Sequence, residues 1–101
     1  ELMDGVKDVN VYNKIFEAVE KVPGASNPHR VRSRMIGNRY IITLDIEVNP
    51  QITITQAHEI AGAVEKSIES SIDNVYDILV HVEPAGECQT DEKFGVDKDM
   101  V

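Results

Sequence analysis

Apolar residues recur at helical spacing in two parts of the chain, and both series predict amphipathic helices. Over residues 11–22 they repeat every three or four positions, and Gly24 follows as a residue suited to end a helix. A second stripe repeats in the same way over residues 55–71. Thr53 and Gln56 have the spacing of a capping box, which predicts where the second helix begins.

Three other segments follow a period of two, which is typical of half-buried strands. They cover residues 29–36, 40–48 and 75–83, and the Gly37-Asn38 dipeptide predicts a tight hairpin between the first two. The order helix, strand, strand, helix, strand predicts an α+β domain in which both helices pack on one face of a three-stranded sheet. The other face of the sheet is then left uncovered.

The uncovered face is expected to mix polar and apolar side chains. Arginines at every second position from Arg30 to Arg34 share one side of the first strand. Thr43 and Asp45 alternate with apolar residues on the second strand, and Leu79 lies on the corresponding side of the third. A mixed open face of this kind predicts either a dimer contact or a ligand site.

Length and charge exclude several classes of protein. The 101 residues fit one domain, and the net charge of −8 argues against a nucleic-acid-binding surface, which needs a basic footprint. One cysteine excludes an internal disulfide and a cysteine-rich zinc site. No apolar run approaches the roughly 20 residues of a membrane span. Because the chain opens at Glu1 and not at a methionine, we expect it to be part of a longer protein.

The sequence carries no motif for covalent or nucleotide chemistry. Its serines do not lie in a G-x-S-x-G elbow. Its six glycines form neither a phosphate loop nor a dinucleotide fingerprint. We therefore expect that the chain is not an enzyme.

Histidine and acidic residues are the candidates for chemistry. His29 begins the first predicted strand, Asp45 lies on the polar side of the second, and His81 and Glu83 share a face of the third. His58 lies at the edge of the apolar stripe of the second helix. Imidazole nitrogens and carboxylate oxygens are ligands for Zn, Fe, Mn or Co. Spacing alone leaves two interpretations open for each residue, a metal ligand or an ordinary solvated side chain.

Four parts of the chain resemble the cytoplasmic C-terminal domain of cation diffusion facilitators, which are proton-coupled exporters of divalent metals. The likeness covers about residues 1–84, and it is carried by ELMDG (residues 1–5), by VPG with RVRSR (22–24 and 30–34), by DIEVNP with QAHEIA (45–50 and 56–61), and by HVEP (81–84). The resemblance implies a ferredoxin-like, metallochaperone-like fold. It also implies a V-shaped homodimer that metal draws together to promote transport.

The resemblance implies a ligand set as well, formed by His29, Asp45, His58, His81 and Glu83. Asp45 stands where many zinc-transporting members have histidine, and such an oxygen-rich set leans toward Fe(II) or Mn(II). Magnetosome iron transporters of this family show similar departures. The expected cofactor is therefore a divalent cation, with Zn, Fe and Mn all open, and its affinity should fall as the pH drops through the histidine range near about 6.5.

Three regions follow from this interpretation. Residues 1–7 are expected to be a juxtamembrane linker, 8–84 the regulatory domain, and 85–101 an acidic flexible tail. The domain would belong to a membrane-spanning transporter and lie on the cytoplasmic side of an inner or magnetosome membrane. The alternative that stays open is a metal-independent ferredoxin-like module that binds a partner protein or a small molecule.

Overall fold

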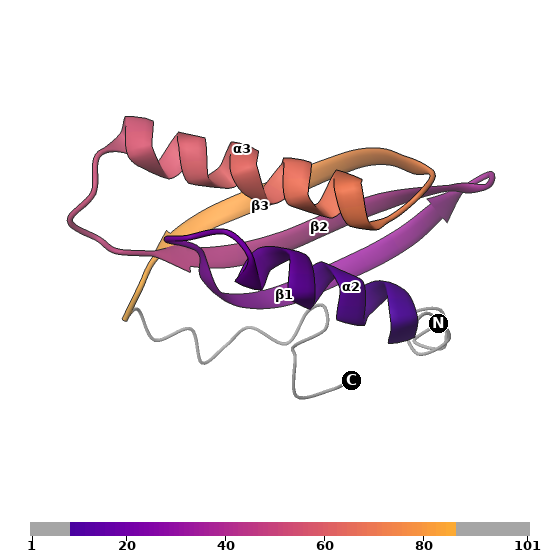
Figure 1. The fold of residues 1–101 in the computed structure, drawn as a ribbon, viewed down its shortest axis with the longest axis horizontal. Coiled ribbons are helices and arrows are strands. Elements are labelled where there is room, and N and C mark those ends of the chain that lie inside the picture. The colour runs from indigo at the N-terminus through magenta and orange to yellow at the C-terminus, as the bar shows by residue number, and fades with distance from the viewer. Residues whose placement is uncertain (1–8, 87–101) are drawn as a thin grey trace.

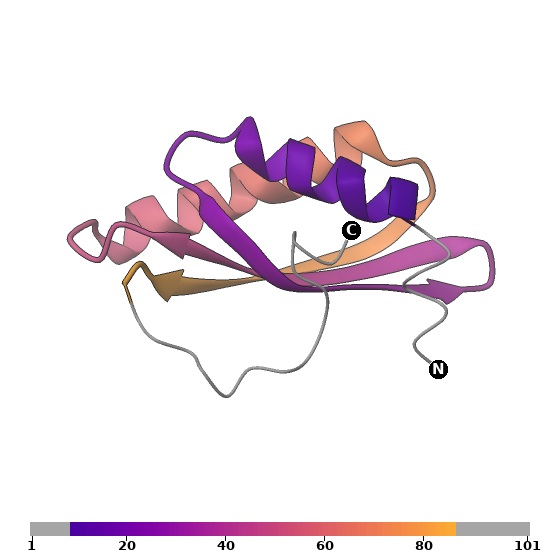
Figure 2. The same ribbon diagram turned by 90° about the horizontal axis from the view of Figure 1, so that it is seen from below.

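The computed structural model describes residues 9–86, which form two helices and three strands in the predicted order. The elements are α2 (Val9–Glu20), β1 (Ser26–Ile36), β2 (Arg39–Val48), α3 (Ile54–Ser71) and β3 (Val75–Pro84). Both helices lie on one face of the sheet (Figures 1 and 2). The predicted α+β class and its two layers are therefore confirmed.

Two of the expected regions fall mainly outside the described residues. These are the predicted linker, residues 1–7, and the part of the predicted tail from residue 87 onward. At the boundary, the Ala85 N–H donates a hydrogen bond of 2.8 Å to the Val48 carbonyl, so pairing with β2 continues one residue past β3. Among residues 9–86, neither helix combines the length and the apolar character that crossing a bilayer requires.

β2 is the central strand of the sheet, whose order is β1-β2-β3. It pairs antiparallel with β1 across the predicted hairpin turn, and parallel with β3 across a connection that contains α3. Alternate residues of β2 from Ile42 to Val48 are buried under the helices, as the pattern predicts. Thr43, Asp45 and Glu47 lie between them and point to the opposite side of the sheet, which we call the open face.

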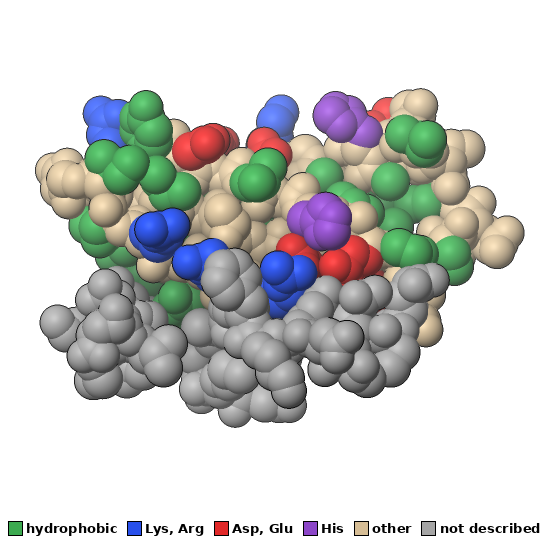
Figure 3. Space-filling view, turned by 180° about the vertical axis from the view of Figure 1, so that it is seen from behind, with side chains coloured by type: hydrophobic (Ala, Val, Ile, Leu, Met, Phe, Trp, Pro, Cys, Tyr) green, Lys and Arg blue, Asp and Glu red, His purple; other side chains and the backbone are tan. Residues whose placement is uncertain are grey.

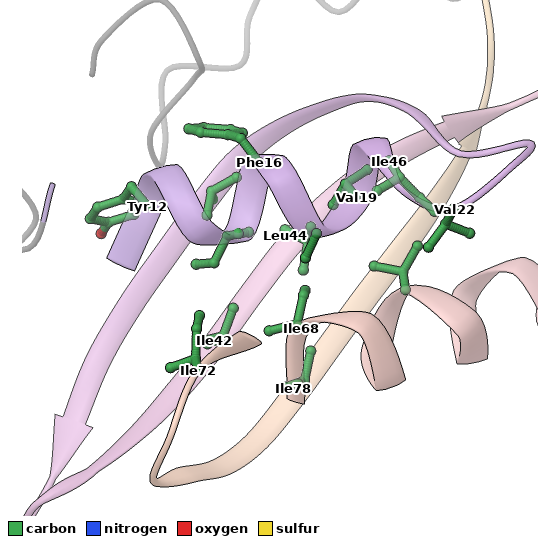
Figure 4. Close-up of a cluster of buried hydrophobic side chains, with 14 of the residues drawn as sticks. Tyr12, Phe16, Val19, Val22, Ile42, Leu44, Ile46, Ile68, Ile72 and Ile78 are labelled. Atoms are coloured by element: carbon green, nitrogen blue, oxygen red, sulfur yellow. The ribbon is translucent and has the colours of Figure 1, made fainter. Parts of the chain in front are cut away.

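The hydrophobic core fills the space between the helices and the sheet (Figure 4). The central positions of β2 are almost fully buried, with Ile42 and Ile46 at 0% exposure and Leu44 at 1%. Their partners from the other elements include Tyr12, Ile15, Phe16, Val19, Val31, Val64, Ile68, Ile72 and Ile78. Tight packing of this kind restricts movement of the backbone. The open face is thus supported from behind by a dense apolar layer.

Local contacts fix the ends of the two helices. The Gln56 N–H donates to Thr53 Oγ1 at 3.0 Å, and the Thr53 N–H donates to Gln56 Oε1 at 2.9 Å, which confirms the predicted capping box. After α2, Gly24 adopts a φ of +92°, and a Cβ at this position would lie 2.9 Å from Ile60 Cδ1. Glycine therefore allows the chain to turn close against α3.

β1 departs from the regular alternation that the sequence predicts. Between the pairs that His29 and Arg32 form with β2, β1 has two residues where β2 has one, and a second irregularity precedes His29. Asn27 and Arg30 have left-handed backbones, with φ of 48° and 50°. Strict alternation would turn His29 toward the core beside Val31. The bulge turns it to the open face instead.

Candidate metal centre

The open face brings together predicted ligands from all three strands. His29 of β1 is paired with Asp45 of β2, which is paired in turn with His81 of β3. Glu83 lies two residues further along β3, on the same face as His81. A depression of about 330 Å³ opens on this face, with Asp45 and His81 in its lining. The strand pairing, together with the bulge in β1, thus gathers four of the five predicted ligands.

The four side chains lie within a few ångströms of one another. His29 Nε2 is 3.1 Å from Glu83 Oε1 and 3.8 Å from Asp45 Oδ2. His81 Nδ1 is 3.4 Å from Asp45 Oδ1 and 3.5 Å from Glu83 Oε2. Figure 3, seen from the side opposite to Figure 1, shows histidine, acidic and basic side chains next to one another on this surface. Each carboxylate therefore contacts both imidazoles.

Three of the four side chains are buried although they are polar. His29 is 9% exposed, and Asp45 and Glu83 are each 7% exposed, whereas His81 lies open to solvent. Burial of a charged group is costly unless other groups compensate it. Within the described residues, Asp45 Oδ2 has no hydrogen-bond partner. This carboxylate oxygen is therefore well suited to accept a cation.

His29 is held in the tautomer that a metal ligand needs. Its Nδ1 lies 2.7 Å from the Asn27 carbonyl oxygen, which can only accept a hydrogen bond, so Nδ1 carries a proton. Nε2 is left to face the carboxylates of Glu83 and Asp45. The lone pair of Nε2 would be the ligand for a cation bound between these carboxylates. Ligating histidines are commonly oriented in this way by a backbone carbonyl.

Two overlapping groups of side chains can each hold a cation. Asp45, His81 and Glu83 form one group, and His29, Glu47 and Glu83 form the other. Within each group, the candidate ligand atoms lie within 4.8 Å of one another. Glu83 belongs to both groups. Mixed nitrogen and oxygen donors suit zinc, iron and manganese.

Sequence reasoning missed two residues of this region. Glu47 was not among the predicted ligands, although its position two residues after Asp45 puts it on the same face. It accepts a hydrogen bond of 2.9 Å from Asn27 Nδ2. Arg30 was expected on the uncovered face but not among the residues around the ligands, and its Nη1 lies 3.4 Å from Asp45 Oδ2. Alternation already puts Arg30 on this face, but spacing alone did not show how close its guanidinium lies to Asp45.

His58 lies apart from the four strand residues. It is exposed on α3, which covers the other face of the sheet. Among the described residues, it belongs to neither of the two groups of ligand atoms. A role for His58 as a ligand stays a prediction, and it would require a separate place or a second copy of the chain.

The model of a protein family described as "Cation efflux protein, cytoplasmic domain" matches residues 8–85. The chain belongs to this family. The match spans all the helices and strands described above, and it confirms the family that the sequence motifs resemble. The family is described by cation efflux and not by a catalysed reaction.

Curated relatives show which proteins contain similar domains. Magnetosome protein MamM of Magnetospirillum gryphiswaldense is 35% identical over 82 residues. The manganese efflux system protein MneS of Bacillus subtilis is 31% identical over 87 residues. These matches cover 81% and 82% of this chain but only 26% and 28% of the relatives. The chain therefore spans about a quarter of the length of these two relatives.

A solved structure supports the same assignment. The metal-bound C-terminal domain of the CzcD transporter from Thermotoga maritima matches with a TM-score of 0.77 at 36% sequence identity. The match covers 82% of this chain and 96% of that domain. It confirms the predicted ferredoxin-like fold, and it shows that a close structural neighbour in this family has been solved with metal bound.

Proposed function

We propose that this chain is the regulatory, dimerising cytoplasmic domain of a divalent metal cation transporter, and that it binds its regulatory cation through His29, Asp45, His81 and Glu83. The convergence of two imidazoles and two carboxylates from three strands, with contacts of 3.1 to 3.8 Å, carries this proposal. Membership of the cation efflux family supports it, as does the metal-bound structural neighbour.

Charge provides the mechanism by which the cation acts. Buried carboxylates such as Asp45 and Glu83 repel one another, and a divalent cation removes that repulsion. In a pair of domains splayed as a V, the cation favours the closed arrangement only if it binds that arrangement more tightly. The net charge of −8 raises the local concentration of cations around the domain. Closure then promotes transport by the membrane part.

Exposed apolar side chains support a second copy as the partner. Met35, Ile36 and Tyr76 are half exposed or more, and pairing of β1 and β3 with β2 gathers them at one end of the sheet. Arg39 joins this end, with its guanidinium 6.0 Å from the centre of the Tyr76 ring. A small apolar contact at the sheet end would leave the metal centres free to move relative to each other.

The remaining assignments of this proposal concern the whole transporter. The cation is Zn, Fe or Mn, and the domain lies on the cytoplasmic side of an inner or magnetosome membrane. Residues 8–84 are the regulatory unit, residues 1–7 link it to the membrane part, and residues 85–101, most of which lie outside the described residues, are its acidic C-terminal segment. One relative, MneS, is named for manganese efflux, and another, MamM, is named as a magnetosome protein. These names support more than one metal as a candidate for the bound cation.

Calorimetric titration with Zn²⁺, Mn²⁺ and anaerobic Fe²⁺ tests the metal centre. Wild type should bind at least one of them, and combining Asp45→Ala with His81→Ala should weaken binding at least tenfold. Asp73→Ala, which removes an exposed carboxylate before β3, is the control and should bind as wild type does. Equal heats for wild type and the double variant would refute these ligands. A solution-scattering profile unchanged by a chelator would favour the metal-independent interaction module.

A further inference from the structure

A positively charged side chain, that of Arg30, already lies in the candidate metal centre. Arg30 Nη1 is 3.4 Å from Asp45 Oδ2, the buried oxygen that has no hydrogen-bond partner within the described residues. The Asp45 side chain is 10% exposed and that of Arg30 is 33% exposed, so the guanidinium enters from the solvent side. The same oxygen faces His29 Nε2 at 3.8 Å. The arginine and a bound metal would therefore compete for one carboxylate oxygen.

The backbone holds Arg30 in this place at a steric cost. Its φ of 50° is unfavourable for a residue with a Cβ. The bulge that contains it puts His29 on the same face as Arg30, so that both lie close to Asp45, whereas neighbouring residues of a regular strand point to opposite faces. From Arg32 to Ile36 the pairing with β2 is regular. The irregular geometry is thus confined to the part of β1 before Arg32. This part places the His29 imidazole and the Arg30 guanidinium next to the Asp45 carboxylate.

We infer that Arg30 is a built-in counter-ion of the metal centre, which occupies Asp45 until a divalent cation displaces it. This inference rests on the proposed function of that centre. A guanidinium keeps its positive charge at any physiological pH, so it repels an incoming divalent cation at all times. Metal binding therefore requires the guanidinium to leave Asp45 for solvent. Arg30 in this way raises the metal concentration at which the domain responds.

The test compares Arg30→Gln with Arg34→Gln by calorimetric titration with Zn²⁺ and Mn²⁺. Both variants lose one positive charge from β1, but Arg34 is exposed in the regular part of the strand. Arg30→Gln should bind metal about tenfold more tightly than wild type, equivalent to about 1.4 kcal/mol. Arg34→Gln should change affinity less than threefold. Arg30→Lys, which keeps the charge, should return affinity toward that of wild type.

Further measurements separate this inference from the function it rests on. Without metal, Arg30→Gln should melt at a lower temperature than wild type, and metal should raise its melting temperature by more. If Arg30→Gln does not fold, Arg30→Gly takes its place, because glycine suits the positive φ. Metal binding by wild type with no gain in the Arg30 variants would overturn the inference alone. If wild type and its Asp45→Ala variant give the same heats, both the centre and its counter-ion are refuted.

Discussion

The two nitrogens of His29 have separate tasks in the metal centre. Nδ1 is fixed by the Asn27 carbonyl at 2.7 Å, and Nε2 faces Glu83 at 3.1 Å. A metal ion can take the lone pair of Nε2 only when this nitrogen carries no proton. Metal binding through Nε2 would therefore be coupled to proton release at this residue.

Metal binding by wild type should release a proton, and its affinity should fall as the pH is lowered below the ordinary histidine range at about 6.5. Affinity falls at low pH because protons compete with metal for the same nitrogen. Titration at one pH in two buffers of different ionisation enthalpy measures the release, and titration at several pH values measures the affinity. The His29→Gln variant should release fewer protons than wild type when it binds metal. Identical heats in both buffers would contradict the coupling.

At the scale of elements, the bulges of β1 decide where the ligands lie. Asn27 is the first left-handed residue, with φ of 48°, and asparagine tolerates this conformation better than most side chains. Its Nδ2 also donates to Glu47 Oε2 at 2.9 Å. One side chain thus supports the backbone turn, and it holds a neighbouring carboxylate in place.

Asn27→Val should destabilise the domain by about 1–2 kcal/mol, because a β-branched side chain is strained at positive φ. It should also weaken metal binding, since the bulge positions His29. Asn27→Gly accepts the same φ and should retain more stability than the valine variant. Urea unfolding measures the free energies, and Arg34→Val in the regular part of β1 is the control. An Asn27→Val variant as stable as the glycine variant would show that the bulge carries no strain.

Thr53→Ala should lower the free energy of unfolding by about 1 kcal/mol, because it removes the oxygen that caps α3. Thr53→Ser keeps that oxygen and should stay close to wild type. Thr55→Ala, which changes an exposed residue in the first turn, is a matched control. Metal affinity should be the same in all three variants, because α3 lies on the other face of the sheet. Chemical unfolding and calorimetry together check both statements.

Periodicity predicted the elements well because each of them buries one regular face. The alternation of β2 placed Asp45 correctly, and the capping box located the start of α3. The bulges of β1 could not be predicted, because they use Asn27 and Arg30 at positive φ where no glycine marks the turn. Alternation puts Arg30 and Asp45 on the same face, but it shows neither how close the two side chains come nor how deeply the carboxylates are buried.

At the scale of the whole molecule, two copies are needed for the proposed response to metal. The apolar end of the sheet offers the contact, while the metal centre lies elsewhere on the open face. This separation allows one contact to hold the copies together and the other to change their angle. Dimer formation and metal response should therefore respond to different substitutions.

Combining Met35→Ser with Tyr76→Ser should weaken self-association by about tenfold or more, because both side chains lose apolar area at the proposed contact. Ile54→Ser is the matched control, since Ile54 is 89% exposed at the start of α3, away from that end of the sheet. Sedimentation velocity over a range of concentrations measures the effect. Equal weakening by the control, or none by the double variant, would place the contact elsewhere.

Within the described sheet, the two outer strands are not paired with each other, because β2 lies between them. The side chains of His29 and Glu83 nevertheless meet across it at 3.1 Å. An ion held between them would act as a clasp over the middle strand, fastening both edges of the sheet at once. Amide hydrogens of β1 and β3 near the clasp should then exchange with deuterium more slowly once metal is added, while those of α2 change little.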